Sequence, residues 1–120
     1  MDSITGLASR SDAIGRLNDR CRQGYDRTAR IVVTRTCLGA LAGDTLAAQA
    51  VAQATLLQAI RRHRFADGDR VRDRGDFLID GVRVYFTIDC YDRNLEYGSE
   101  DPADATVTCR VLTIMLRDDL

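Results

Sequence analysis

The chain has 120 residues, enough for one domain and too few for two. It is 45% hydrophobic and 29% charged with a formal net charge of −1, which is typical of a globular protein and excludes a strongly basic or disordered one. All 17 basic residues are arginines, which excludes chemistry that needs a lysine amine, such as Schiff-base catalysis, pyridoxal-phosphate attachment or a Walker phosphate loop.

The same composition predicts a cytoplasmic protein. No apolar run approaches the ~20 residues that span a bilayer, and the first residues lack the basic-then-apolar order of a secretory signal. The four cysteines are scattered, form no C-x-x-C pair and are accompanied by a single histidine, His63. We therefore expect reduced, mostly buried thiols, with no disulfide, no metal site, no cofactor and no membrane partner.

The first element expected is a helix over residues 12–23, after a flexible tail at 1–10. Ser11 is suited to cap its start and Gly24 to end it. Ile14, Leu17 and Cys21 form its apolar stripe, and the opposite, charged face carries Arg16, Asp19, Arg20 and Arg22.

A short β-branched strand is expected at Arg30–Thr36, followed by a glycine-containing connection at 37–43. Asp44 then precedes the clearest helix, which extends from Thr45 to His63 without Gly or Pro. Its expected buried side consists of Leu46, Ala50, Leu57 and Ile60.

A polar loop at 65–75 leads into a predicted β-hairpin. Asp80-Gly81 is the signature of a two-residue turn in which both residues have positive φ. This turn places Ile79 opposite Val82 and Phe77 opposite Val84. The core face then consists of Phe77, Ile79, Val82, Val84 and Phe86.

The C-terminal part is expected to be irregular over 90–100 and then helical from Asp101, with Pro102 in the first turn. Val107, Val111 and Ile114 supply a helical stripe, although the β-branched residues of this run leave a strand as the main alternative. The predicted fold is a single small α+β domain of order α-β-α-β-β-α. Its three-stranded sheet contains the hairpin and has helices packed on one face.

The densest basic stretch is a candidate for phosphate contacts with nucleic acid. It comprises Arg61, Arg62, Arg64, Arg70, Arg72 and Arg74. Interleaved acids reduce its net charge to about +2, and no aromatic stacking platform accompanies it. Solvated surface with local ion pairs is the simpler interpretation, so we expect no direct nucleic-acid binding.

A second candidate is the acidic, tyrosine-bearing segment after the hairpin, which is suited to a protein interface. Its candidate contact residues are Asp89, Tyr91, Asp92, Glu96, Tyr97, Glu100 and Asp101. Structural turns capped by aspartates are the simpler alternative. An enzyme would instead use Asp89 and Asp92, with Tyr91 or His63, around a metal or small ligand. No catalytic triad can be assembled, and Cys90 is expected to be buried rather than nucleophilic.

Three motifs carry a family resemblance: Ile88-Asp89-Cys90-Tyr91-Asp92, the stretch from Tyr97 to Asp104, and Arg110 to Leu116. With them, the chain resembles the short bacterial proteins grouped as domain-of-unknown-function family 3768. It departs from that pattern at Cys90 and Cys109, where a tyrosine-like and a basic residue are expected.

The resemblance carries no established activity, but similar proteins are often encoded on plasmids and prophages. It therefore implies a mobile-element accessory protein, for example an anti-CRISPR-like inhibitor of a host defence ribonucleoprotein. Small size and the missing catalytic sets favour a non-enzymatic protein-binding module that acts by occlusion; a homodimer is also compatible with these features.

Overall fold

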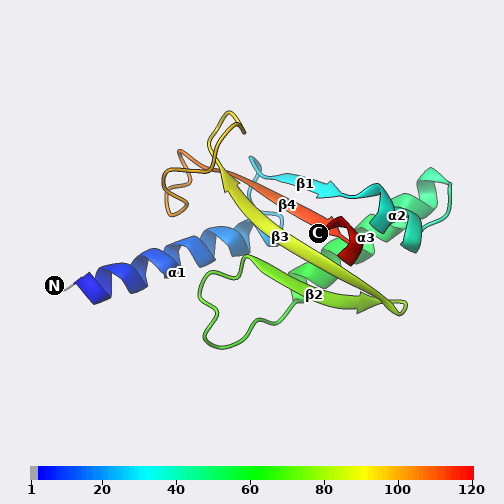
Figure 1. Cartoon of the computed structure of the whole chain (residues 1–120), viewed down its shortest axis with the longest axis horizontal. Coiled ribbons are helices and arrows are strands. Elements are labelled where there is room, and N and C mark those ends of the chain that lie inside the picture. Colours follow the sequence, from blue (N-terminus) through cyan, green and yellow to red (C-terminus); the bar gives the residue numbers. More distant parts are fainter. Residues whose placement is uncertain (1–2) are drawn as a thin grey trace.

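The computed structural model describes residues 3–120, with side chains from Arg10 onward. The chain forms a small α+β domain with three α-helices and a mixed sheet of four strands (Figure 1). In chain order the elements are α1 (Ser3–Arg22), β1 (Arg30–Val33), α2 (Arg35–Leu41), α3 (Leu46–Arg62), β2 (Arg74–Ile79), β3 (Val82–Tyr91), β4 (Cys109–Met115) and the 3₁₀ turn η1 (Arg117–Asp119).

The strand order is β1-β4-β3-β2, so the last strand lies in the middle of the sheet. β4 pairs parallel with β1 and antiparallel with β3. The predicted C-terminal helix is therefore wrong, and so are the three-stranded sheet and the element order that depended on it. The β-branched run pairs with strands on both sides, and this pairing outweighs the helical spacing of its apolar residues. Asp101 caps a turn instead, because its Oδ1 accepts the Ala103 N–H at 3.1 Å.

The predicted hairpin is confirmed with its register. Ile79 pairs with Val82 and Phe77 with Val84. Asp80 and Gly81 have φ of 49° and 80°, as the tight turn requires. All five residues predicted for the core face belong to the hydrophobic core or pack against it.

The core lies between one face of the sheet and the helices, as predicted. Cys21 of α1, Cys37 of α2, and Leu56 and Ile60 of α3 pack against inward residues of β3 and β4. Those inward residues are Val84, Phe86, Ile88, Leu112 and Ile114. Alternation along the strands directs Tyr85, Thr87 and Asp89 to the opposite face, away from the three helices (Figure 1).

The buried side of α3 is only partly the predicted one. Ile60 is buried and Leu57 packs against the core, as predicted, whereas Leu46 is 85% exposed and Ala50 is also exposed. Ala52 and Leu56 are buried instead. The connection predicted at 37–43 is also largely helical, because Thr34 caps α2 by accepting the Cys37 N–H. Alanine-rich sequence marks a helix well but does not identify which face is buried.

α1 begins at Ser3 rather than near Asp12 and packs closely through its last turns. Gly15 is buried, and a Cβ there would collide with the Arg70 carbonyl oxygen. Arg22, expected on the exposed face, is 6% exposed and donates to the carbonyls of Ile60 and Arg61 at the end of α3. Flexibility of residues 1–10 stays a prediction; Met1 and Asp2 lie outside the described residues. Within the described part of the chain, no helix is long and apolar enough to cross a membrane.

Candidate functional site

The acidic segment after β3 forms a compact excursion, residues 92–107, which we call the end loop. Its base is a short antiparallel contact in which Tyr91 bridges Gly98 and the Ser99 N–H donates to the Cys90 carbonyl. In Figure 1 the end loop stands beyond β3 and β4, at the end of the sheet where β1 begins.

Three of its aspartates hold the backbone in shape. Asp92 Oδ1 accepts the N–H groups of Asn94 and Glu96 at 3.1 and 3.0 Å. Asp104 Oδ1 accepts both the N–H and the hydroxyl of Thr106, and these bonds lower the pKa of the exposed Asp104 carboxyl. Asp101 caps its own turn and pairs with Arg10 at 2.8 Å. The turn-capping alternative is therefore confirmed for these residues.

The side chains that this frame displays are mixed: three large apolar or aromatic ones stand among charged ones, including Arg93. Tyr97 is 73% exposed, Leu95 40% and Val107 41%, and the exposed Glu96 and Glu100 accompany them. A shallow hollow between the arms of the loop is lined by Asp92, Arg93, Tyr97, Gly98, Glu100, Thr106 and Val107.

Leu95 is held in an unusual conformation. The Leu95 N–H donates to the Asp92 carbonyl at 3.0 Å and closes the turn, with Leu95 at φ 60°. The left-handed region costs an ordinary L-residue about 1–2 kcal/mol, and glycine or asparagine adopts it more readily. An exposed leucine here therefore adds strain without contributing to the core.

The form of the enzyme alternative that combines Asp89 with His63 does not assemble in this geometry. Asp89 is exposed on the open sheet face, where its Oδ2 accepts the Thr87 hydroxyl. His63 packs edge-on against Phe65 and Phe86 at centroid distances of 4.7 and 5.3 Å, on the core face. Burial lowers the pKa of His63. Asp89 and His63 thus lie on opposite faces of the sheet.

All four cysteines are unpaired. Cys21, Cys37 and Cys109 are buried, as expected, whereas Cys90, which was also expected to be buried, is only half-buried because it lies near the end of β3. Burial raises the pKa of Cys21 to about 12, and that of Cys90 is also raised by burial. Within the described part of the chain, no group of three or more His, Cys, Asp or Glu side chains could hold a metal ion.

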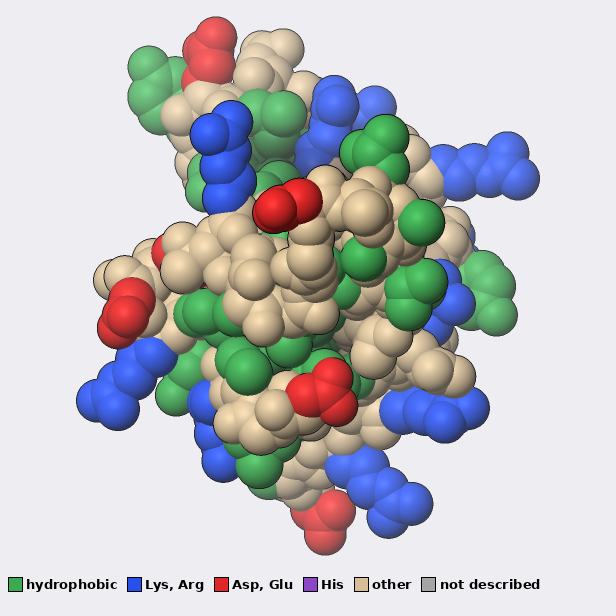
Figure 2. Space-filling model, turned by 90° about the vertical axis from the view of Figure 1, so that its right-hand side faces the viewer, with side chains coloured by type: hydrophobic (Ala, Val, Ile, Leu, Met, Phe, Trp, Pro, Cys, Tyr) green, Lys and Arg blue, Asp and Glu red, His purple; other side chains and the backbone are tan. Residues whose placement is uncertain are grey.

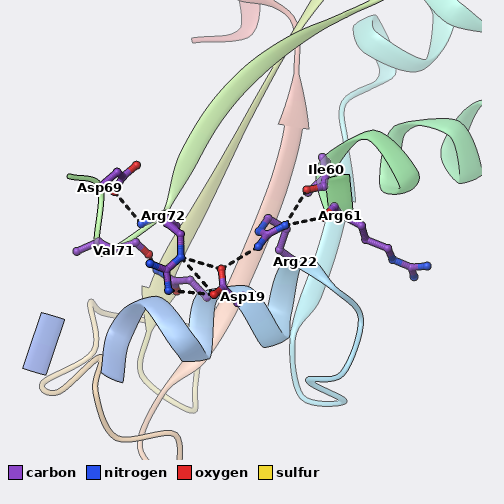
Figure 3. Close-up of polar contacts among 8 residues, drawn as sticks. Asp19, Arg22, Ile60, Arg61, Asp69, Val71 and Arg72 are labelled. Atoms are coloured by element: carbon purple, nitrogen blue, oxygen red, sulfur yellow. Dashed lines mark hydrogen bonds and ion pairs between the residues drawn. The ribbon is translucent and has the colours of Figure 1, made fainter. Parts of the chain in front are cut away.

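Half of the arginines in the basic stretch are held in ion pairs. Arg72 donates twice from Nε and once from Nη2 to the Asp19 carboxylate at 2.9–3.2 Å (Figure 3). Arg70 pairs with Asp12 at 3.6 Å and Arg74 with Asp73 at 3.5 Å. The Arg70 and Arg72 contacts join the 65–75 loop to α1.

Asp19 is the centre of this network. Burial alone would raise its pKa, but hydrogen bonds and charges from Arg72 and Arg22 outweigh burial and lower the pKa. Arg22 Nη2 donates to Asp19 Oδ1 at 2.8 Å, and Arg22 Nη1 donates to the Ile60 carbonyl at the end of α3 (Figure 3). Because Asp19 also binds Arg72, its carboxylate connects α1 with both α3 and the 65–75 loop.

A cluster of arginines that the sequence did not single out lies at the end of the sheet. A hollow of about 430 Å³, which we call the arginine hollow, is lined by Arg27, Thr28, Ala29, Arg30, Arg93 and Cys109. A second hollow shares Arg27 and Thr28 with it and adds Arg20, Asp26 and Arg110. The only local hint in the sequence is the R-x-x-R spacing before β1.

An apolar groove lies at the other end of the molecule. Figure 2 shows green side chains gathered around a depression on this face. The groove is lined by residues of α2, α3 and the hairpin turn, including Leu41, Ala47, Val51 and Ile79.

The family described as "protein of unknown function (DUF3768)" matches residues 41–119, more than half of the chain. The chain belongs to this family. No curated protein and no solved structure matches the chain significantly. The region shared with the family contains α3, β2, β3, β4 and the end loop, while α1, Arg27 and Arg30 lie before it.

Proposed function

We propose that the protein is a non-enzymatic protein-binding module that acts by occlusion, with the end loop as its contact surface. The observation that carries this proposal is Leu95, an exposed leucine held at φ 60° within a hydrogen-bonded turn. Strained residues that add nothing to folding are typical of functional positions.

The rigidity of the loop supports this role. Asp92, Asp101 and Asp104 fix the backbone before any partner arrives, so little ordering entropy is lost on binding. Tyr97 and Leu95 provide exposed area of the kind that anchors interfaces.

The surrounding charge indicates the kind of partner. Glu96 and Glu100 flank the apolar side chains, and we expect them to face a basic protein surface around an apolar pocket. Proteins that hold RNA or DNA carry such surfaces. An inhibitor of a host defence ribonucleoprotein, of the anti-CRISPR kind, is a concrete form of this function.

The two alternatives have less support. One form of the enzyme hypothesis combines Asp89 with His63, and these two residues lie on opposite faces of the sheet. The nucleic-acid hypothesis requires the stretch from Arg61 to Arg74 to present its charge, and three of its arginines are in ion pairs.

The test replaces Leu95 by Asn, which adopts a left-handed conformation more easily. We expect Leu95→Asn to raise the free energy of unfolding by about 0.5 kcal/mol in urea titration, since the strain is relieved. Partner binding should weaken about tenfold or more, as expected for an interface anchor. A variant that is more stable but binds more weakly would show that Leu95 serves binding, because loss of a structural residue would lower stability as well.

The partner is first captured from a lysate of the host, and its affinity for purified variants is then measured. Leu46→Asn is the matched control, because it removes another exposed leucine at the opposite end of the molecule. Charge reversal at Glu96 should also weaken binding. A partner that binds Leu95→Asn, Tyr97→Ala and wild type equally would disprove the end loop as the contact surface.

A further inference from the structure

The ion pairs of the fold leave eleven arginines of residues 10–120 without a carboxylate partner, and three of these eleven line one hollow. Six arginines pair with carboxylates within residues 10–120: Arg10, Arg22, Arg70, Arg72, Arg74 and Arg83. In the same part of the chain, Arg27, Arg30 and Arg93 have no carboxylate within 4 Å, although the chain contains one more acid than base. The lining of the arginine hollow itself contains no carboxylate.

The sheet topology brings these arginines together. β1 runs parallel to β4, and β3 runs antiparallel to both, so the starts of β1 and β4 meet the end of β3. Arg30 begins β1, Cys109 begins β4, and Arg93 follows β3 by two residues. Arg27 belongs to the connection that leads from α1 to β1.

Next to this hollow lies a buried charge that is also without a counterion. Arg110 is 2% exposed; its Nε donates to Asn18 Oδ1 at 2.7 Å and its Nη2 to the Pro102 carbonyl at 2.5 Å. Both acceptors are neutral, and no carboxylate within residues 10–120 pairs with it. A buried cation normally has an ionic partner, so Arg110 raises the positive potential of this region.

Three carboxylates line the neighbouring hollows: Asp92 and Glu100 line the end-loop hollow, which shares Arg93 with the arginine hollow, and Asp26 lines the second hollow. Asp26 Oδ1 accepts the Thr28 N–H at 2.9 Å and the Thr28 hydroxyl at 2.7 Å. It therefore holds the turn before β1 and offsets only part of the charge of Arg20, Arg27 and Arg110 around it.

We propose that the arginine hollow binds the terminal phosphate of a small phosphorylated compound. Guanidinium groups match phosphate oxygens with paired hydrogen bonds, and a phosphomonoester carries up to two negative charges on one group. Several arginines around one hollow suit such a concentrated charge. A nucleic-acid backbone spreads single charges along a strand and is better matched by an extended basic stripe. This site borders the proposed protein contact, because Arg93 belongs to the end loop and lines both hollows, but phosphate binding needs no partner protein.

The first probe is inorganic phosphate, titrated into the full chain at constant ionic strength and followed by ¹H–¹⁵N NMR. We expect saturable shifts at the amides of residues 27–30, 93 and 109. Arg30→Gln and Arg93→Gln should each weaken binding about tenfold, since each removes a charge-assisted contact. Arg62→Gln is the matched control, because Arg62 is exposed on α3 and has no ion pair within residues 10–120; it should bind like wild type.

A second arm uses an eight-nucleotide oligothymidylate with and without a 5′-phosphate. We expect the phosphorylated form to bind more tightly, and Arg30→Gln to remove the difference. Equal binding of both forms would overturn the proposal and indicate a backbone-phosphate site. Chemical shifts that do not saturate with phosphate would also overturn the proposal. So would an equal loss of phosphate affinity in Arg62→Gln and Arg30→Gln, because both results indicate that phosphate associates nonspecifically with the positive charges of the surface. Circular dichroism of each variant verifies that the fold is retained.

Discussion

The two arginine-rich regions of this protein differ in what their guanidinium groups contact. The stretch from Arg61 to Arg74 is the densest in the sequence, yet Arg70, Arg72 and Arg74 pair with carboxylates in the fold. The arginine hollow collects residues that are far apart in the sequence, and none of its three arginines pairs with an acid within residues 10–120. Charge density along a chain therefore does not predict unpaired charge in space. Here α1 brings Asp12 and Asp19 to the dense stretch and neutralises part of it.

The largest effect should come from the contact between α1 and that stretch. In Gly15→Ala, the new Cβ would collide with the Arg70 carbonyl oxygen and come within 2.6 Å of Arg72 Nη2. The clash should exceed the gain of about 1 kcal/mol in helix propensity and lower the free energy of unfolding by about 2–3 kcal/mol in urea titration. Gly39→Ala in α2 is the control, because nothing lies within 4 Å of its Cβ. It should be neutral or stabilising, and equal losses in both variants would show that α1 does not pack this closely.

The second prediction compares one arginine from each region. Arg72→Gln should lower the free energy of unfolding by about 2 kcal/mol, because it leaves the partly buried Asp19 without its main partner. Arg30→Gln should change it by less than about 0.5 kcal/mol, because an exposed side chain with no ion pair contributes little to folding. Chemical denaturation of the two variants measures both values. Similar losses of unfolding free energy in the two variants would show that arginines with and without an ion pair contribute equally to folding.

The third and smallest effect concerns acid. In the unfolded chain the pKa of Asp19 has its ordinary value of about 3.8, and in the folded protein the Arg72 and Arg22 contacts lower it. The carboxylate therefore stabilises the fold fully above about pH 4, and this contribution is lost as the pH falls through the folded pKa. Between about pH 5 and pH 3, wild type should lose more stability than Asp19→Asn, which starts lower and has no carboxylate to protonate. Parallel pH profiles for the two proteins would contradict the role given to the Asp19 network.

Local signals in the sequence were sufficient for some elements. Asp80-Gly81 with alternating apolar residues determined the hairpin and its register, because a two-residue turn leaves one pairing. The long Ala- and Leu-rich run determined the existence of α3, but not its buried side. Ala packs on any face, so neighbouring elements decided that Leu56 is buried and Leu46 is exposed.

The segment after β3 was predicted to offer an exposed surface, and its role as a binding site stays a prediction. The residues after β3 do form a distinct surface, and Tyr97, Glu96 and Glu100 are exposed on it. Asp92 and Asp101 instead hold turns through their side chains. Residue type and position in the sequence were compatible with this role but did not decide between it and an interface role. Leu95 was missed because its significance lies in its φ of 60°, which no residue pattern indicated.

By itself, the sequence determined the α+β class, the hairpin, the long helix and the absence of lysine chemistry. Only the tertiary structure decided that Cys109–Met115 is the strand between β1 and β3. That pairing joins Arg30 to Val111 and Tyr91 to Cys109, and it brings Arg27, Arg30 and Arg93 around one hollow. The physical reason is that strand pairing satisfies the backbone over long sequence separations. The same β-branched residues in isolation are compatible with either a helix or a strand.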